Sequence, residues 1–184
     1  MCIRDSSIFD PAGVEVVREF DTPDWDPDKA QQEMEQAITA LGKNGFDGVY
    51  VANDGMASGA IAALKGANID PSTRPVTGQD AEIAGIQRIL TGEQLMTVYQ
   101  PIKKIAETAA ELAVNLVNDK RADADKLATA KVDNGQEQVP SVLLDTVVVT
   151  KDNIKDTVIA DGFLKVDQIC TSAYQQACAA AGLE

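Results

Sequence analysis

Four side chains spread along the chain have the chemistry that binds a small polar ring: Trp25, Asn53, Asp80 and Gln100. The indole of Trp25, the only tryptophan, offers a flat face that packs well against the C–H face of a pyranose. The carboxylate and the two amides offer hydrogen-bond acceptors and donors that match neighbouring hydroxyl groups. Together these residue types predict a binding site for a monosaccharide.

Each of these residues also has a purely structural interpretation. Asn53 or Asp54, and likewise Asp80, stand where a helix N-cap is expected, and such a cap stabilises a helix by about 1 kcal/mol without any ligand. Trp25 is as well suited to anchoring a loop in the core, and Gln100, which precedes a proline, to a solvated strand end. Four such groups in four successive loops favour a binding site over coincidence.

The elements that must position these residues are alternating strands and helices. The patterns predict strands at residues 14–20, 48–52, 75–78 and 95–99, and helices at residues 30–41, 56–65, 81–90 and 102–118. This alternation predicts an α/β fold with a doubly wound parallel sheet and right-handed crossovers. Ligands of such sheets bind beyond the carboxyl ends of the strands, where the four residues stand.

The remaining segments complete the expected α/β architecture. Residues 118–139 are polar and indicate a loop, residues 142–150 indicate a strand, and residues 153–158 and 173–181 indicate helices. Hydrophobic residues make up 45% of the chain and aromatic residues 4%. The core must therefore be built from Ala, Val, Ile and Leu, which suits helices packed on a parallel sheet.

Residue types and motif spacing argue against an enzyme. Histidine is absent, which removes the commonest general base and the commonest catalytic zinc ligand. The spacing of Gly55 and Gly59 is not the glycine pattern that admits a dinucleotide pyrophosphate. Residues 24–28 mimic a calcium loop, but Lys29 occupies the position that needs glycine, so their carboxylates are expected to cap the next helix. We expect no catalytic residue, no cofactor and no metal.

The charge of the chain excludes two classes of partner. The formal net charge is −13, from 29 acidic and 16 basic residues, and the Lys and Arg residues are scattered. Nucleic acid and anionic membrane surfaces would both be repelled. No segment approaches the roughly 20 apolar residues of a membrane span.

The cysteines leave two interpretations open. Cys170 and Cys178 fit either an exported protein with one disulfide or a cytosolic protein with two inert thiols. On one unbroken helix these positions lie roughly 12 Å apart, too far to be bridged. A disulfide therefore requires a bend, which Thr171 and Ser172 can provide.

Four runs of sequence, at residues 51–64, 76–82, 96–102 and 139–144, resemble those of D-xylose-binding proteins, the periplasmic receptors of sugar ABC transporters. The resemblance extends from about residue 14 to residue 182. It implies the type I periplasmic-binding fold, with a sugar ligand and a membrane permease as partners, a monomeric state and a periplasmic location.

The resemblance also implies roles for the four residues. Trp25 matches the aromatic residue that stacks on the sugar, and Asn53 and Asp80 match polar residues that bind its hydroxyl groups. Gln100 stands where these proteins usually have a lysine. An amide keeps the hydrogen bonding but loses the charge, which leaves the preferred sugar open.

The resemblance further implies a division of the chain. Residues 1–6 are a separate matter: they resemble a translated sequencing adapter and are excluded from the fold, so we expect the true N-terminus, with its signal peptide, to be missing.

In the family resemblance, residues 7–100 correspond to the C-terminal sugar-binding lobe without its first strand. Residues 101–140 correspond to a hinge-crossing helix and loop that belong to a missing N-terminal lobe, and residues 141–184 to a return strand and the C-terminal helices.

We expect this fragment to have an unsatisfied surface. The apolar stripe of Ile105, Leu112 and Leu116 would pack on the missing lobe and is otherwise exposed, which favours aggregation. The fragment alone is expected neither to fold stably nor to bind sugar tightly.

Three classes of function compete: a transport receptor, a sugar-responsive transcription regulator of the same fold, and an α/β enzyme. A signal peptide upstream would favour the receptor, and a basic helix-turn-helix the regulator. The net charge of −13 and the xylose-receptor runs favour transport, and the enzyme lacks histidine, a nucleophile elbow and a phosphate loop.

Overall fold

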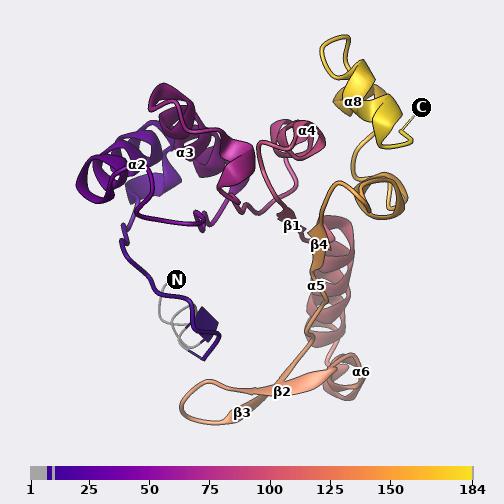
Figure 1. Cartoon of the computed structure of the whole chain (residues 1–184). Helices are drawn as coiled ribbons and strands as arrows, with labels where there is room; N and C mark the ends of the chain where they lie inside the picture. The colour runs from indigo at the N-terminus through magenta and orange to yellow at the C-terminus, as the bar shows by residue number, and fades with distance from the viewer. Residues whose placement is uncertain (1–7, 10, 184) are drawn as a thin grey trace. The chain divides into compact units, whose positions relative to one another are not determined.

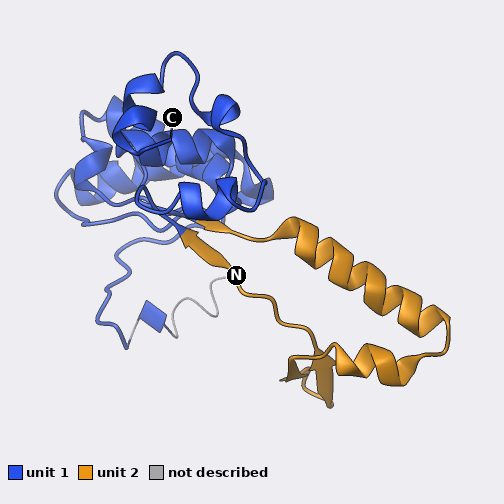
Figure 2. Ribbon diagram, turned by 90° about the vertical axis from the view of Figure 1, so that its right-hand side faces the viewer, with its two compact units in different colours: residues 1–97, 149–184 blue, residues 98–148 orange. Residues whose placement is uncertain are grey.

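The computed structural model describes residues 8, 9 and 11–183, so the segment predicted to derive from an adapter, residues 1–6, lies outside the described residues. The chain divides into two compact units, with residues 1–97 and 149–184 in unit 1 and residues 98–148 in unit 2 (Figure 2). Unit 1 is mainly helical, and unit 2 combines two helices with a two-stranded hairpin (Figure 1).

Unit 1 opens its helical part with α2 (Pro27–Leu41), which follows a short 3-10 turn, η1 (Pro23–Trp25). Asp26 Oδ1 accepts hydrogen bonds from the backbone N–H groups of Asp28, at 2.8 Å, and Lys29, at 3.1 Å. The proline at the first position already has a helical φ. The expectation that the acidic loop caps this helix is therefore confirmed for Asp26.

The next helix, α3 (Asp54–Gly66), packs against α2. Small residues let the two helices approach closely, since a Cβ at Gly59 would overlap the backbone oxygen of Pro27. The core around this pair of helices contains apolar residues from both helices and from the loops beside them, namely Met34, Phe46, Ala57, Ala60, Ile61, Ala63, Leu64, Ile69 and Val76.

A second 3-10 turn, η2 (Pro71–Thr73), leads to α4 (Ile83–Thr91). This helix buries Ile86, Ile89 and Leu90 along one face and ends at Gly92, which has a left-handed φ of 80°. The helices predicted at residues 30–41, 56–65 and 81–90 are confirmed to within a few residues at each end.

The segments between these helices lie side by side as a sheet-like layer. Val49 and Val76 form a parallel bridge, in which the Val49 N–H donates to the Pro75 carbonyl at 2.8 Å and the Thr77 N–H donates to the Val49 carbonyl at 3.1 Å. The Leu95 N–H extends the layer by donating to the Val76 carbonyl at 2.9 Å. The two predicted strands at residues 48–52 and 75–78 are thus parallel neighbours, but the regular pairing is limited to one bridge.

The strand predicted at residues 14–20 is wrong. These residues have no regular secondary structure, and Val14, Val16 and Val17 are exposed. The alternation of valines with polar residues shows that the segment can form a strand, but a strand also needs a neighbouring backbone to pair with. Among the described residues no segment pairs with it, so the pattern alone was misleading.

The strands that adjoin the boundary between the units are β1 (Thr97–Tyr99) and β4 (Val147–Val149), and they pair as a two-stranded sheet. They are shorter than the strands predicted at residues 95–99 and 142–150. After β4 the chain forms η3, a π-helical turn at Lys155–Ile159, which overlaps the predicted helix at residues 153–158. The buried residues of this part include Val149, Ile154 and Val158.

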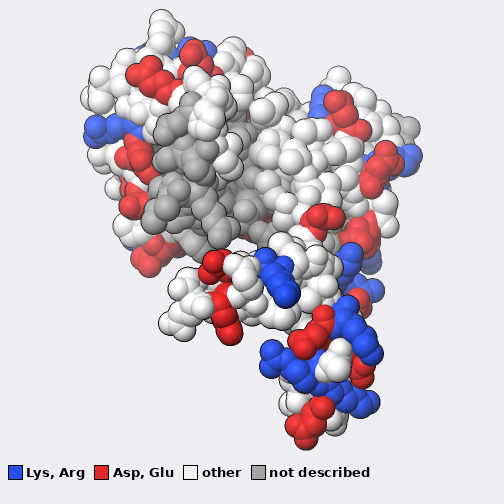
Figure 3. Space-filling view, turned by 90° about the horizontal axis from the view of Figure 1, so that it is seen from below, with Lys and Arg blue, Asp and Glu red and all other residues white. Residues whose placement is uncertain are grey.

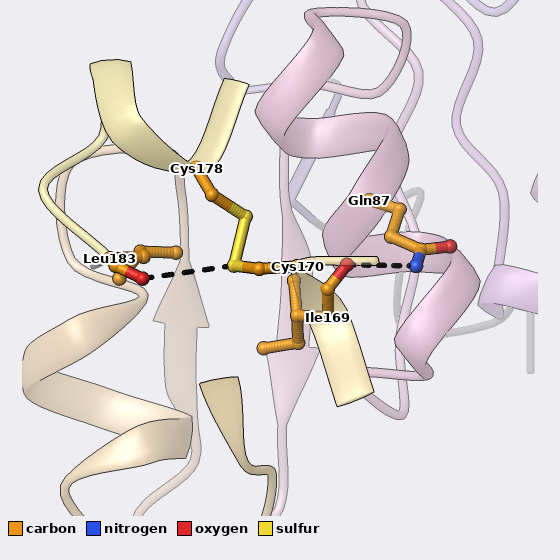
Figure 4. The surroundings of a disulfide bond; sticks show 5 residues. All are labelled: Gln87, Ile169, Cys170, Cys178 and Leu183. Atoms are coloured by element: carbon orange, nitrogen blue, oxygen red, sulfur yellow. Dashed lines mark hydrogen bonds between the residues drawn. A yellow bond between two sulfur atoms is a disulfide. The ribbon is translucent and has the colours of Figure 1, made fainter. Parts of the chain in front are cut away.

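The chain ends in two short helices, α7 (Val166–Ile169) and α8 (Gln175–Ala180), that pack against α4. A disulfide joins Cys170 and Cys178 across the bend between them (Figure 4). The Gln87 side-chain amide of α4 donates to the Ile169 carbonyl at 3.0 Å. The bend after Ile169 lets the two cysteines meet, as a bridge between these positions requires.

Unit 2 consists of a long helix, α5 (Ile102–Val117), a short helix, α6 (Arg121–Lys126), and an antiparallel hairpin of β2 (Ala130–Asp133) and β3 (Gln138–Ser141). The expectation that residues 118–139 form a loop is therefore wrong. Residues 134–137 form the hairpin turn, closed by the Asn134 N–H donating to the Glu137 carbonyl at 3.2 Å. Gly135 has φ of 86°, and the Asn134 side chain accepts from the N–H groups of Gln136 and Glu137 at 2.9 Å each.

Helix α5 contains no buried residue. Ile105 and Leu116 are exposed and Leu112 is half-buried in unit 2, so the expected exposed stripe is present. No helix among the described residues has the length and apolar composition for a membrane crossing. On the described part of the face drawn in Figure 3, the Lys and Arg side chains lie among Asp and Glu side chains.

Candidate functional site

The first turns of α2, α3 and α4 meet at one edge of unit 1. Gly55, in the first turn of α3, shows how closely they lie. A Cβ at this position would be 3.7 Å from Asn53 Oδ1, 3.8 Å from the Pro27 ring and 4.0 Å from Glu82 Oε1. The loops that precede these helices, which carry Trp25, Asn53 and Asp80, are thereby brought to the same edge, beyond the ends of the layer formed around Val49 and Val76.

Trp25 is the last residue of η1 and directly precedes the N-cap of α2. Its side chain is 62% exposed, so the interpretation of Trp25 as a core anchor is wrong for this chain. Both Asp24 and Trp25 have a left-handed backbone, with φ of 59° and 53°. An exposed indole on a constrained turn is a surface on which a flat apolar face can stack.

Asn53 caps α3, because its Oδ1 accepts a hydrogen bond from the Met56 N–H at 2.8 Å. The structural interpretation of this residue is therefore confirmed. It does not compete with a binding role, since one amide oxygen has two acceptor positions and the amide nitrogen has two donors.

Asp80 is exposed and has a left-handed backbone with φ of 93°. Its interpretation as an N-cap is wrong, because α4 begins later and its N-cap is Glu82. The Asp80 carboxylate lies near enough to Glu82 to raise the pKa of Glu82, after the larger effects of burial and of Asp54. An exposed carboxylate on a strained turn has no capping role to explain it.

Asp54, which follows the same predicted strand as Asn53 and was an alternative N-cap to it, is the centre of a buried network. Asp54 is fully buried, and its carboxylate accepts hydrogen bonds from the Gln94 amide at 2.7 Å, the Glu82 N–H at 2.9 Å and the Thr97 hydroxyl at 3.0 Å. Arg88 donates to the Asp54 carbonyl at 2.7 Å. Burial raises the pKa of Asp54, and the accepted hydrogen bonds and Arg88 oppose that rise.

Gln100 belongs to unit 2 and lies between β1 and α5. It is half-buried, and its carbonyl accepts a hydrogen bond from the Ile102 N–H at 2.7 Å. The structure therefore brings three of the four predicted residues to one edge of unit 1 and places the fourth in the other unit.

None of the four predicted residues lines either of two shallow hollows in the described surface. One hollow lies on α2, between Gln32 and Ala40, and the other lies beside α6 and the hairpin of unit 2. Trp25 and Asp80 are instead exposed at the edge where the three helices begin.

Comparison with known proteins identifies the class of this fold. Residues 3–121 match the family described as periplasmic binding protein domain. A carbohydrate transporter solute binding protein from Chloroflexus aurantiacus, solved in complex with D-glucose, superposes with a TM-score of 0.67 at 31% identity, covering 78% of this chain and 42% of that one. The α/β fold is thus that of the type I periplasmic binding proteins, and the chain belongs to the periplasmic binding protein domain family.

Two curated relatives show which periplasmic binding proteins the chain resembles in sequence. The chain is 44% identical over 160 residues to the D-xylose-binding periplasmic protein of Escherichia coli (strain K12), covering 87% of this chain and 47% of that protein. It is 44% identical over 150 residues to the protein of the same name from Haemophilus influenzae, covering 82% and 43%. The resemblance to the xylose-binding family is confirmed, and the chain spans about half the length of these relatives.

Proposed function

We propose that this chain forms one wall of a cleft that binds a monosaccharide, xylose or a related sugar, in a periplasmic receptor that delivers the sugar to an ABC transporter permease. The observation that carries the proposal is the convergence of three helix starts at one edge of unit 1, with an exposed Trp25 and an exposed Asp80 beside the capping Asn53. The similarity to D-xylose-binding proteins supports the same conclusion.

Each residue has a distinct part in this proposal. Trp25 stacks its indole on the C–H face of the sugar ring. Asp80 accepts hydrogen bonds from sugar hydroxyl groups, and Asn53 donates from its amide nitrogen while its oxygen caps α3. Gln100, the remaining predicted residue, offers a neutral amide to the sugar. A neutral amide in this position favours a ligand chosen by its hydroxyl pattern rather than by charge.

The other wall of the cleft belongs to a second lobe. Unit 2 presents α5 with Ile102 at 57% and Val114 at 59% exposure, an apolar surface that suits packing against further protein. In this proposal residues 7–100 and 141–184 belong to the C-terminal lobe, and residues 101–140 cross the hinge to the N-terminal lobe. Sugar binding closes the two lobes, and the closed form docks on the permease.

The proposed activity is binding without covalent chemistry. The chain has no histidine, and Asp54, whose pKa is raised by burial, is fully buried with its carboxylate oxygens accepting structural hydrogen bonds. The proposal therefore assigns no catalytic residue, cofactor or metal to this chain. The proposal also assigns a monomeric receptor in the periplasm. It assigns no nucleic-acid partner, because a net charge of −13 would repel nucleic acid.

The test uses a completed receptor, defined as this chain joined to the part of the E. coli relative that it does not match. Asp80→Ala should abolish measurable sugar binding in calorimetric titration while leaving the thermal unfolding temperature unchanged, because the carboxylate is exposed and caps no helix. Asp47→Ala is the matched control and should bind sugar as the wild type does, since Asp47 is another exposed carboxylate of unit 1 and is not the N-cap of a described helix. Unchanged affinity in Asp80→Ala would refute the assigned role.

A further inference from the structure

Asp54 holds the turn that carries Asp80 from both sides. Its backbone N–H donates to the Gln79 carbonyl at 2.9 Å, and its Oδ2 accepts from the Glu82 N–H at 2.9 Å. The two residues between these anchors, Asp80 and Ala81, have φ of 93° and 51°. Side chains disfavour this left-handed region, so the turn needs external support to keep its conformation.

Thr97 provides a third support from the next segment of the layer. The Ala81 N–H donates to Thr97 Oγ1 at 3.1 Å, and the Thr97 hydroxyl donates in turn to Asp54 Oδ2 at 3.0 Å. Ala81 and Thr97 are both fully buried. The Thr97 hydroxyl therefore links the Asp54 carboxylate to the backbone of Ala81, in the middle of the strained turn.

The Asp54 carboxylate is tightly enclosed by two glycines and by hydrogen-bond donors. A Cβ at Gly78 would overlap Oδ1 and a Cβ at Gly85 would overlap Oδ2, so glycine leaves the space on both sides. Oδ1 accepts from the Gln94 amide nitrogen at 2.7 Å, and that amide is fixed because its oxygen accepts from Arg88 at 3.0 Å. The described groups that hydrogen-bond to the carboxylate are thus all donors, namely the Gln94 amide, the Glu82 N–H and the Thr97 hydroxyl.

We propose that Asp54 and Thr97 are positioning residues of the sugar site, which fix the Asp80 turn in its binding conformation before the sugar arrives. The inference rests on the proposed function of that site. Both side chains are 0% exposed, so they act on the ligand only through Asp80. Because the turn is already held in its binding conformation, sugar binding does not lose free energy to the conformational entropy of ordering the turn.

The test compares two substitutions of Thr97 in the completed receptor. Thr97→Val keeps the shape and removes the hydroxyl, so it should raise the Kd for sugar about tenfold or more. Thr97→Ser keeps the hydroxyl and should bind within about twofold of the wild type. Leu64→Ala is the control for stability, because it opens the core of α3 and should lower the unfolding temperature without changing the Kd.

A second measurement needs no sugar. Hydrogen exchange of the Ala81 amide should become faster in Thr97→Val and stay slow in Thr97→Ser, since only the serine keeps the acceptor. Asp54→Asn should speed the same exchange, because its amide nitrogen must face one of the donors that surround the carboxylate.

The outcomes separate this inference from the proposed function. If the wild type binds no sugar while the exchange pattern holds, the proposed function fails and Asp54 and Thr97 remain a support of the turn only. If the wild type binds sugar and Thr97→Val binds equally well, or if Leu64→Ala weakens binding as much as Thr97→Val, the positioning role is overturned.

Discussion

Removal of the disulfide should destabilise the C-terminal helices by an amount that the loop length determines. Cys170 and Cys178 are separated by 8 positions, and closing so short a loop restricts the unfolded chain by about 2.5 kcal/mol. The double substitution of both cysteines by serine should lower the free energy of unfolding of unit 1 by about that amount. Urea unfolding of the completed receptor, followed by circular dichroism, measures the change.

The structure also predicts where the effect appears. Residues near the disulfide are attached to α4 through the Gln87 to Ile169 hydrogen bond at 3.0 Å and through the contacts of α7 and α8 (Figure 4). Hydrogen exchange should therefore accelerate in α7 and α8 before it does in α3. Dithiothreitol should bring the wild type to the midpoint of the variant and leave the variant unchanged. A variant whose urea midpoint equals that of the oxidised wild type would refute the assigned contribution.

Two further predictions concern packing and pH. Gly59→Ala should lower the free energy of unfolding by about 1 to 3 kcal/mol because its Cβ would overlap the Pro27 carbonyl, whereas Gly66→Ala, with nothing within 4 Å, should be neutral or stabilising; equal urea midpoints for the two variants would contradict this. Burial raises the folded-state pKa of Glu82, so its contribution to stability is present at low pH and is lost as pH rises through the folded pKa. Relative to wild type, Glu82→Gln should therefore gain stability as pH rises from the ordinary carboxyl range through the raised folded-state pKa of Glu82, and a difference that stays constant as pH rises would contradict the direction of the shift.

The helices were predictable because their signals are local. Ala30, Met34 and Ala37 bury one face of α2, and the positions of Asp26, Asn53 and Gly92 mark where helices begin or end. Strands depend on partners far along the chain, so the patterns at residues 14–20 and 48–52 indicated more regular pairing than the chain forms.

The hairpin of β2 and β3 was overlooked although the sequence carries its signal. Asn134 followed by Gly135 is the strongest short-range indication of a tight hairpin turn, and it lies between two segments of alternating polarity. The polar composition of residues 118–139 obscured it.

The sequence indicated the residue types of the candidate site, but it did not indicate the hydrogen bonds through which Asp54 holds the Asp80 turn. Asn53 and Asp80 follow from the loops that end the layer, but the role of Asp54 depends on partners 28, 40 and 43 positions away. The exposure of Trp25, 62%, likewise depends on how the turn at Asp24 is folded. Such distant contacts leave no periodic pattern in the sequence.

The most direct test of the account is a titration of the completed receptor with xylose, glucose and other pentoses and hexoses, followed by calorimetry and by tryptophan fluorescence. We expect saturable binding of at least one sugar and a fluorescence change that is lost in Trp25→Phe, since the proposed site stacks the exposed indole on the sugar ring. A folded receptor that binds none of these sugars would contradict the central claim.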